Sequence, residues 1–337
     1  MNEPKNNSFQ EIFDSLKNAK RILISLHPSP DGDSFGCCTA MKYFLERDFG
    51  AKVRLISPSP LAGNFSTLSL AQEIEIGVDI CDLDSKDYDI ILLMDYGSLK
   101  SFSVKKMGRF SLPSSAFVVN IDHHAVNDYS GNLNYVDSTQ PSACSLLLDF
   151  FISMHVTFDS SLAHRLLIGV CTDSGFFSYD TNPNKALKDA LFLIENGADY
   201  LGGVLKPILY NQPLNLKRYF GYLFSHIKIN EELKCGSVSV PLEEIKKLGL
   251  NGAEARLGIN ELQFISDFDF VFTLVDFGDY IKGSFRSKRG VDVSLFAKEL
   301  GGGGHRVAAS FMFNNIDLKE AERHVFDAIR KVGIQRF

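Results

Sequence analysis

The first half of the chain alternates short, continuous apolar runs with longer stretches of helical periodicity. Apolar runs without polar interruptions are typical of strands that are buried on both faces of a parallel sheet. Four such runs are predicted as strands, at 21–26, 52–57, 88–94 and 116–121. Helices are predicted at 34–47, 142–154, 160–171 and 184–196. This half therefore predicts an α/β domain whose parallel sheet has helices on both faces.

The pattern changes after the last of these helices. Segment 201–224 has helical periodicity, and we expect Pro207 and Pro213 to interrupt it. Strands are then predicted at 235–240, 268–277 and 280–286, with a tight turn at Gly278-Asp279, and a helix at 318–332 closes the chain. We therefore expect an N-terminal domain at 1–205, a helical linker at 206–230, and a smaller α+β domain with a mixed sheet at 231–337.

Composition narrows the class of protein. Hydrophobic residues make up 45% of the 337 positions and charged residues 23%, which is typical of a globular protein. The net charge of −6 argues against binding of long duplex nucleic acid through a broad basic surface, but permits a small anionic substrate held by a few cations. No apolar stretch approaches the roughly 18 residues that span a bilayer. Six cysteines without a CxxC pair predict reduced thiols, so we expect a cytoplasmic protein.

The tripeptide Asp122-His123-His124 closes the fourth predicted strand. With eight histidines in the chain, an adjacent pair is expected by chance only about 0.2 times. The tripeptide lies where a parallel strand ends, and open α/β sheets bind ligands at that edge. Two imidazoles and a carboxylate there can bind a metal ion.

Other acids and a histidine occupy the equivalent place on neighbouring strands. His27, Asp31 and Asp33 follow the first strand, Asp95 ends the third, and Asp173 follows an apolar helical run. Taken singly, Asp33 could instead cap a helix, and Asp95 and Asp173 could be turn residues. The strands share one edge, however, so these side chains are expected to converge. Their number exceeds the needs of one ion and favours a pair about 3.5–4 Å apart, with Mn²⁺ preferred and Mg²⁺ or Co²⁺ as alternatives.

A second set of candidate residues lies near the C-terminus. The glycine run 301–304, which includes Gly303 and Gly304, can bring several backbone N–H groups to one anion, although a flexible turn is the alternative. His305 follows the run, and Arg286 can bind a phosphate through two hydrogen bonds. We therefore expect an anion-binding site in the second domain.

In this combination the sequence resembles the DHH phosphoesterase superfamily. The resemblance rests on His27-x-x-x-Asp31-x-Asp33, Asp95, Asp122-His123-His124 and Asp173, and on Phe285-Arg286-Ser287 and the glycine run before His305, which match a DHH-associated domain. The family pattern implies that His27, Asp31 and Asp95 hold one ion, and that Asp33, Asp95, His123 and Asp173 hold the other. Asp95 would bridge the ions, and His124 would face the substrate phosphate.

The arrangement of two domains looks most like the NrnA branch of this superfamily. The resemblance implies a metal-dependent phosphodiesterase that converts short oligonucleotides, such as nanoRNA and pApA, to 5′-mononucleotides, with 3′-phosphoadenosine 5′-phosphate as a further expected substrate. A cyclic di-AMP phosphodiesterase, an inorganic pyrophosphatase and a non-catalytic nucleotide sensor stay open as alternatives. Apolar helices in the first domain would permit a homodimer.

Overall fold

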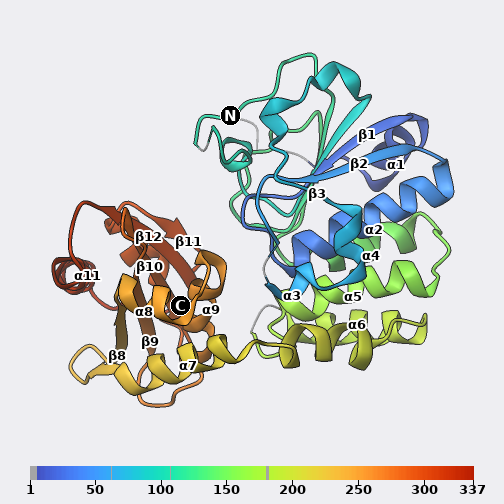
Figure 1. Ribbon diagram of the computed structural model, residues 1–337. Coiled ribbons are helices and arrows are strands. Elements are labelled where there is room, and N and C mark those ends of the chain that lie inside the picture. The colour runs from blue at the N-terminus through green and yellow to red at the C-terminus, as the bar shows by residue number, and fades with distance from the viewer. Residues whose placement is uncertain (1–5, 62, 107, 180–181) are drawn as a thin grey trace. The chain divides into compact units, whose positions relative to one another are not determined.

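The computed structural model describes residues 6–61, 63–106, 108–179 and 182–337 (Figure 1). The chain divides into two compact units, one ending at Asn211 and the other running from Gln212 to Phe337. Each unit has its own six-stranded sheet.

The sheet of the first unit is parallel throughout, in the order β3-β2-β1-β4-β5-β6. Its strands are β1 (Arg21–Ser25), β2 (Lys52–Ser57), β3 (Glu75–Ile76), β4 (Ile90–Met94), β5 (Val118–Asp122) and β6 (Leu133–Val136). The predicted parallel sheet is confirmed, and β3 and β6 extend it at its two edges. Because all strands run the same way, the carboxyl ends of β1, β4 and β5 lie at one edge.

Both faces of this sheet are buried, which explains why its strands are continuously apolar. Ile22, Ile24 and Leu92 face a core built with α-helices, while Leu23 and Ile91 face a smaller cluster on the other side. The α-helices are α1 (Phe9–Asn18), α2 (Gly32–Phe49), α3 (Gly63–Ser66), α4 (Ala143–Ser153), α5 (Ser160–Asp173) and α6 (Pro183–Glu195). Short 3₁₀ helices complete the unit: η1 (Ser69–Glu73), η2 (Ile80–Asp82), η3 (Ser85–Asp87) and η4 (Leu99–Ser101).

Helices α2 and α5 approach each other closely, and glycine makes this approach sterically feasible. A Cβ atom on Gly36 would lie 2.7 Å from the carbonyl oxygen of Arg165. A Cβ atom on Gly169 would lie 2.2 Å from Sγ of Cys144 and 2.5 Å from Oδ1 of Asp33. The contact therefore packs the start of α2, which carries Asp33, against α5, which ends at Asp173.

The first unit ends in a π-helix, η5 (Tyr200–Tyr210), with Pro207 inside it. The expectation that Pro207 interrupts the helix was wrong. A proline ring clashes with the carbonyl four residues earlier in an α-helix, and the wider turn of a π-helix relieves that clash. Pro213 does stand at a boundary, because it is the N-cap of α7 (Leu214–His226).

The second unit has a mixed sheet in the order β11-β12-β10-β9-β8-β7, in which only β8 and β9 pair in parallel among the described strands. Its strands are β7 (Lys228–Asn230), β8 (Cys235–Val240), β9 (Phe270–Asp276), β10 (Tyr280–Ser287), β11 (Gly303–Gly304) and β12 (Ala308–Asn314). Its further helices are α8 (Leu242–Leu248), α9 (Gly252–Leu262), α10 (Val293–Glu299) and α11 (Leu318–Val332). The predicted α+β fold with a mixed sheet is confirmed.

Helix α7, which falls within the expected linker, belongs to the core of the second unit. Its residues Leu216, Tyr219 and Leu223 pack with Val238 and Val240 of β8. The opposite face of the sheet packs against α10 and α11.

Within the described part of the chain, no helix has both the length and the apolar character needed to cross a membrane. All six cysteines are free thiols, and five of them are buried.

Candidate metal centre

The loop after β1 brings three candidate ligands to the edge of the sheet. His27 follows the strand, and Asp31 caps α2 by accepting hydrogen bonds from the backbone N–H groups of Asp33 and Ser34. Because α2 begins at Gly32, the alternative in which Asp33 is the cap is wrong. Asp33 is instead buried in the first helical turn.

The Asp33 carboxylate is fixed by backbone groups from a distant segment. Its Oδ2 accepts from the N–H of Ala143 at 2.6 Å, and its Oδ1 accepts from the N–H of Cys144 at 3.0 Å. These amides belong to the N-terminus of α4, which carries a partial positive charge and favours an ionised carboxylate.

Asp95 follows β4 in an unusual backbone conformation. Its φ of 57° lies in the left-handed region, which is costly for residues other than glycine and is tolerated best by Asn and Asp. The side chain is only 3% exposed, and its Oδ2 is buried with no hydrogen-bond partner among the described residues. A buried carboxylate oxygen without a partner is costly unless a cation binds there.

Asp122 does not take the role that its place in the tripeptide suggested. It is fully buried and accepts hydrogen bonds from the backbone N–H groups of Tyr96 and His123, from Nδ1 of His124 and from the amide of Asn127. It belongs to none of the three groups of side chains whose geometry could hold a metal ion. Its position makes Asp122 a support for the loops that carry the candidate ligands.

Three groups of potential ligands do converge at this edge. They are His27, Asp31 and Asp95; Asp33, His123 and Asp173; and Asp95, His123 and His124, and within each group the ligand atoms lie within 4.8 Å of one another. The structure therefore brings together all six residues that the sequence suggested as metal ligands.

The two oxygens of Asp95 face different histidines. Oδ2 lies 3.6 Å from Nε2 of His27, and Oδ1 lies 3.4 Å from Nε2 of His123. His123 Nε2 also lies 3.7 Å from Asp33 Oδ2 and 3.6 Å from Asp173 Oδ2. This is the placement that a carboxylate needs to bridge two ions.

These separations fit atoms around a shared cation better than direct hydrogen bonds. Hydrogen bonds between nitrogen and oxygen are about 2.7–3.2 Å long. In octahedral coordination, ligand atoms about 2.1 Å from a common ion are roughly 3.0 Å apart when adjacent and roughly 4.2 Å apart when opposite. The separations of 3.4–3.7 Å in this site lie between these two values. Together with the unpartnered Oδ2 of Asp95, the donor set fits divalent cations with a preference for oxygen and imidazole ligands.

The protonation of the centre reflects crowded, buried charges. Burial alone would lower the pKa of both His27 and His123, but nearby carboxylates outweigh it and raise each pKa well above its ordinary value. Burial raises the pKa of Asp95, yet the two histidines reverse this and hold its pKa below the usual range. Burial and the neighbouring carboxylates raise the pKa of Asp33 to about 7 and raise that of Asp173 as well. The candidate ligands include more carboxylates than imidazoles, so bound cations would offset their negative charge.

The expected anion-binding residues lie in the second unit. Arg286 is on β10, where its Nε donates to Oδ1 of Asn260 at 3.0 Å. Gly303 and Gly304 form β11, and a Cβ atom on Gly304 would lie 2.6 Å from the carbonyl oxygen of Ala308. The exposed His305 follows, and its backbone N–H donates to that same carbonyl at 2.8 Å. Strand β12 pairs with both β11 and β10, so these residues share one end of the sheet.

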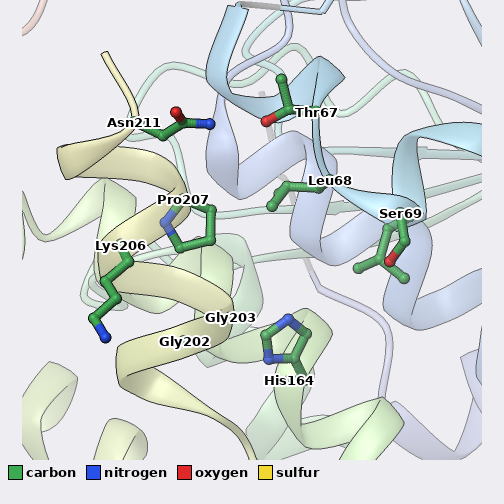
Figure 2. A pocket seen from close by; sticks show the side chains of 10 residues that line it. Thr67, Leu68, Ser69, His164, Gly202, Gly203, Lys206, Pro207 and Asn211 are labelled. Carbon is green, nitrogen blue, oxygen red and sulfur yellow. The ribbon is translucent and has the colours of Figure 1, made fainter.

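A pocket of about 510 Å³ in the first unit lies apart from the metal centre (Figure 2). Gly203 packs directly on the ring of His164, which lines the pocket with Lys206 and Ser69. None of the six candidate ligands lines it. His164 and Asp173 are both on α5, about 13 Å apart along the helix axis at 1.5 Å per residue.

Sequence reasoning missed Asn127. Its side-chain amide donates to Oδ2 of Asp122 at 2.6 Å and to the carbonyl of Tyr96 at 3.1 Å, while its Oδ1 accepts from Asn120 at 3.0 Å. Asn120 lies between Val119 and Ile121 in the middle of β5, whose other polar residue is the terminal Asp122. A buried amide in an apolar strand needs a polar partner, and this was the available signal.

Comparison with known families agrees with this geometry. Residues 21–170 match the DHH family N-terminal domain, and residues 238–332 match the DHHA1 domain. The chain therefore belongs to the DHH family of phosphoesterases and carries a DHHA1 domain, as its motifs suggested.

Its relatives place it near one branch of the family. The bifunctional oligoribonuclease and PAP phosphatase NrnA of Bacillus subtilis (strain 168) is 24% identical over 324 residues, which cover 94% of this chain and 96% of that protein. The expected similarity to NrnA is thus confirmed.

Solved structures support the fold. An exopolyphosphatase-related protein from Bacteroides fragilis matches with a TM-score of 0.86 at 22% identity, over 96% of this chain and 95% of that one. RecJ from Thermus thermophilus in complex with Mn²⁺ matches with a TM-score of 0.54 at 13% identity, over 96% of this chain and 54% of RecJ.

Proposed function

We propose that this protein is a Mn²⁺-dependent phosphodiesterase that hydrolyses short oligonucleotides to 5′-mononucleotides, and that it also accepts 3′-phosphoadenosine 5′-phosphate. The proposal rests chiefly on Asp95, whose two oxygens face His27 and His123 while Oδ2 has no partner in the described part of the chain. It is further supported by the oligoribonuclease and PAP phosphatase named among the relatives. Mn²⁺ is favoured by the donor set and by the Mn²⁺ complex of RecJ.

Two divalent ions, when bound, lower the pKa of water towards neutrality and offset negative charge on a phosphoryl group. In our proposal His27, Asp31 and Asp95 hold one ion, and Asp33, Asp95, His123 and Asp173 hold the other. The backbone amides of α4 keep Asp33 in its orientation, and the constrained backbone of Asp95 directs its carboxylate between the two imidazoles.

His124 is the proposed phosphate-facing catalytic residue. Its Nδ1 lies 2.8 Å from Oδ1 of Asp122. Burial opposes protonation, but the hydrogen bond and charge of Asp122 outweigh it and raise the pKa of His124. A protonated imidazole donates to a phosphoryl oxygen and stabilises the charge that develops there.

Arg286, Gly303, Gly304 and His305 are the proposed substrate-binding residues of the DHHA1 domain. Arg286 offers a guanidinium to a phosphate, and the glycines permit close approach of the backbone. A few cations of this kind suit a short anionic substrate in a protein whose net charge is −6. We place this activity in the cytoplasm, in keeping with five buried free thiols.

The proposal is tested with purified protein and Mn²⁺ on pApA, short RNAs and 3′-phosphoadenosine 5′-phosphate, with cyclic di-AMP and pyrophosphate for the alternatives. We expect release of 5′-mononucleotides from the first two and loss of turnover in Asp95→Asn. Asp14→Asn, on the exposed face of α1, is the matched control and should retain activity. Turnover of pyrophosphate alone, or none on any substrate, would remove the proposal.

A further inference from the structure

One face of the second unit's sheet is apolar on one half and polar on the other. Over β8 and β9 this face carries Val238, Val240, Val271 and Val275, which pack against α7, α8 and α9. Over β10 and β12 the same face carries polar, half-buried side chains, together with Ala308 and the exposed Met312 of β12. Residues two apart on a strand point to the same face, so Lys282, Ser284 and Arg286 share it on β10, and Ser310 lies beside Ser284 on β12.

Helix α9 lines the edge of this polar area. Arg256 and Asn260 are four residues apart and therefore lie on one side of the helix. Asn260 accepts from Nε of Arg286 at 3.0 Å, and Arg256 lies close enough to Lys282 to repel its charge. Two cations of β10 thus lie alongside α9, which adds a third.

Lys282 is bound to a hydroxyl group. Its Nζ donates to Oγ of Ser310 at 3.0 Å. Ser310 pairs across the sheet with Gly303, so the Lys282 side chain extends towards the glycine run 301–304. A serine hydroxyl brings no negative charge to the ammonium group, which has three N–H donors to satisfy.

Several other cations of the unit have acidic partners. Arg289 pairs with Asp269 at 3.1 Å, and Lys331 pairs with Glu299 at 2.6 Å. Lys282 and Arg256 have no carboxylate within 4.0 Å among the described residues. Burial, reinforced by Arg256, lowers the pKa of Lys282. Two neighbouring cations without a counter-charge destabilise the unit unless an anion binds between them.

We propose that Lys282, Arg256 and Ser310 form a subsite that enlarges the anion-binding site at Arg286 and the glycine run 301–304, so that together they bind the terminal phosphate of a substrate. The inference rests on the proposed function and narrows its substrate class. The protein binds linear substrates with a phosphate group beyond the one that is hydrolysed, such as 5′-phosphorylated dinucleotides. The cations supply charge, and the Ser310 hydroxyl supplies a neutral donor.

The test measures binding without catalysis. The full chain is freed of metal with EDTA and titrated calorimetrically with pApA and with ApA, which lacks the terminal phosphate. We expect pApA to bind at least tenfold more tightly than ApA to the wild type. Lys282→Met should weaken pApA binding about tenfold and leave ApA within twofold, because a long apolar side chain replaces the cation.

Three variants control this measurement. Lys228→Met removes an exposed lysine on β7 that pairs with Glu322, and it should leave both affinities unchanged. Lys282→Arg keeps the charge and should stay within about threefold of the wild type. Arg256→Gln removes the other positive charge of the same subsite. If Lys282→Met does not fold, the pApA affinity of Arg256→Gln tests the subsite in its place.

The outcomes separate the subsite from the catalytic proposal. If pApA binding falls in Lys282→Met while no substrate is ever hydrolysed, the subsite stands and the phosphodiesterase does not. If the wild type binds ApA as tightly as pApA, or if neither Lys282→Met nor Arg256→Gln changes pApA affinity by more than twofold, the subsite is overturned whatever the activity.

Discussion

Asn127 holds Asp122 by a 2.6 Å hydrogen bond from its side-chain amide to Oδ2, and the same amide donates to the carbonyl of Tyr96. Asp122 accepts in turn from the N–H of Tyr96. The two side chains therefore form hydrogen bonds with both the N–H and the C=O group of Tyr96, the residue after Asp95. These bonds support the backbone of Asp95, which has an unfavourable φ of 57°. The pair also binds His124 through Asp122. Two residues outside the three groups of candidate ligands thus help to orient Asp95, the proposed bridging carboxylate, and the imidazole of His124.

Replacing Asn127 should damage catalysis more than substrate binding. Asn127→Leu leaves an oxygen of the buried Asp122 without its donor, and loss of such supporting contacts typically costs about 10–100-fold in metal affinity or activity. We expect kcat at saturating Mn²⁺ to fall by that factor, with KM within about threefold. Asn18→Leu, which removes a hydrogen bond from a side-chain amide to the carbonyl of Asp14 at an exposed helix end, is the control. A tenfold rise in KM at unchanged kcat would contradict this role.

The stability of the metal-free protein should fall as pH rises. His27, His123, Asp33 and Asp173 all have a pKa raised by folding, to about 7 for Asp33. Each contributes stability that is fully present below its unfolded pKa and is lost as pH rises through its folded pKa. Asp95 has the opposite sign, but its loss of stability occurs in acid, below its ordinary pKa. In EDTA, we expect Tm to decrease between about pH 5.5 and pH 8.

Mn²⁺ should reverse this trend. The ion requires neutral imidazoles and ionised carboxylates, so its apparent affinity increases with pH. At about 100 times Kd, binding adds about 2.7 kcal/mol, or roughly 5–11 °C in Tm at 2–4 °C per kcal/mol. The increase should be larger at pH 8 than at pH 6. A Tm in EDTA that rises with pH, or an equal Mn²⁺ effect at both values, would contradict the charge distribution of the site.

Arg286→Ala should mainly raise KM for pApA. The side chain is proposed to bind a phosphate that does not react, so its loss weakens the ground state and the transition state alike. We expect KM to rise at least tenfold and kcat to change less than threefold. Arg323→Ala, an exposed arginine on α11, serves as the control. A loss confined to kcat would argue against an anchor that acts in the ground state.

Two glycine-to-alanine variants test how packing supports the centre. In Gly169→Ala, the new methyl group would overlap Cys144 and Asp33, and overpacking of this kind costs about 1–3 kcal/mol. Gly221, in the middle of α7, has nothing within 4 Å of the place that a methyl group would take, so Gly221→Ala should stabilise by about 0.5–1 kcal/mol. Urea unfolding of both variants measures the difference. Equal stability of the two would show that α2 and α5 are loosely packed.

The sequence predicted the parts of the fold that depend on local pattern. Continuous apolar runs located β1, β2, β4 and β5, and the acids at their ends located the candidate ligands, because parallel strands share an edge. Strand β3 was missed because it is two exposed residues, and no apolar run marks it. The composition of a strand end does not reveal which donors surround each oxygen. The support of Asp33 by the amides of Ala143 and Cys144 comes from a segment far along the chain.

The central claim is that Asp95 bridges two divalent cations. The most direct measurement is anomalous diffraction at the manganese absorption edge from crystals of the protein grown with Mn²⁺. The account predicts two anomalous peaks, one within reach of His27, Asp31 and Asp95, and the other within reach of Asp33, Asp95, His123 and Asp173. A map without anomalous density at Asp95, with His27 and His123 turned away from its carboxylate, would contradict it.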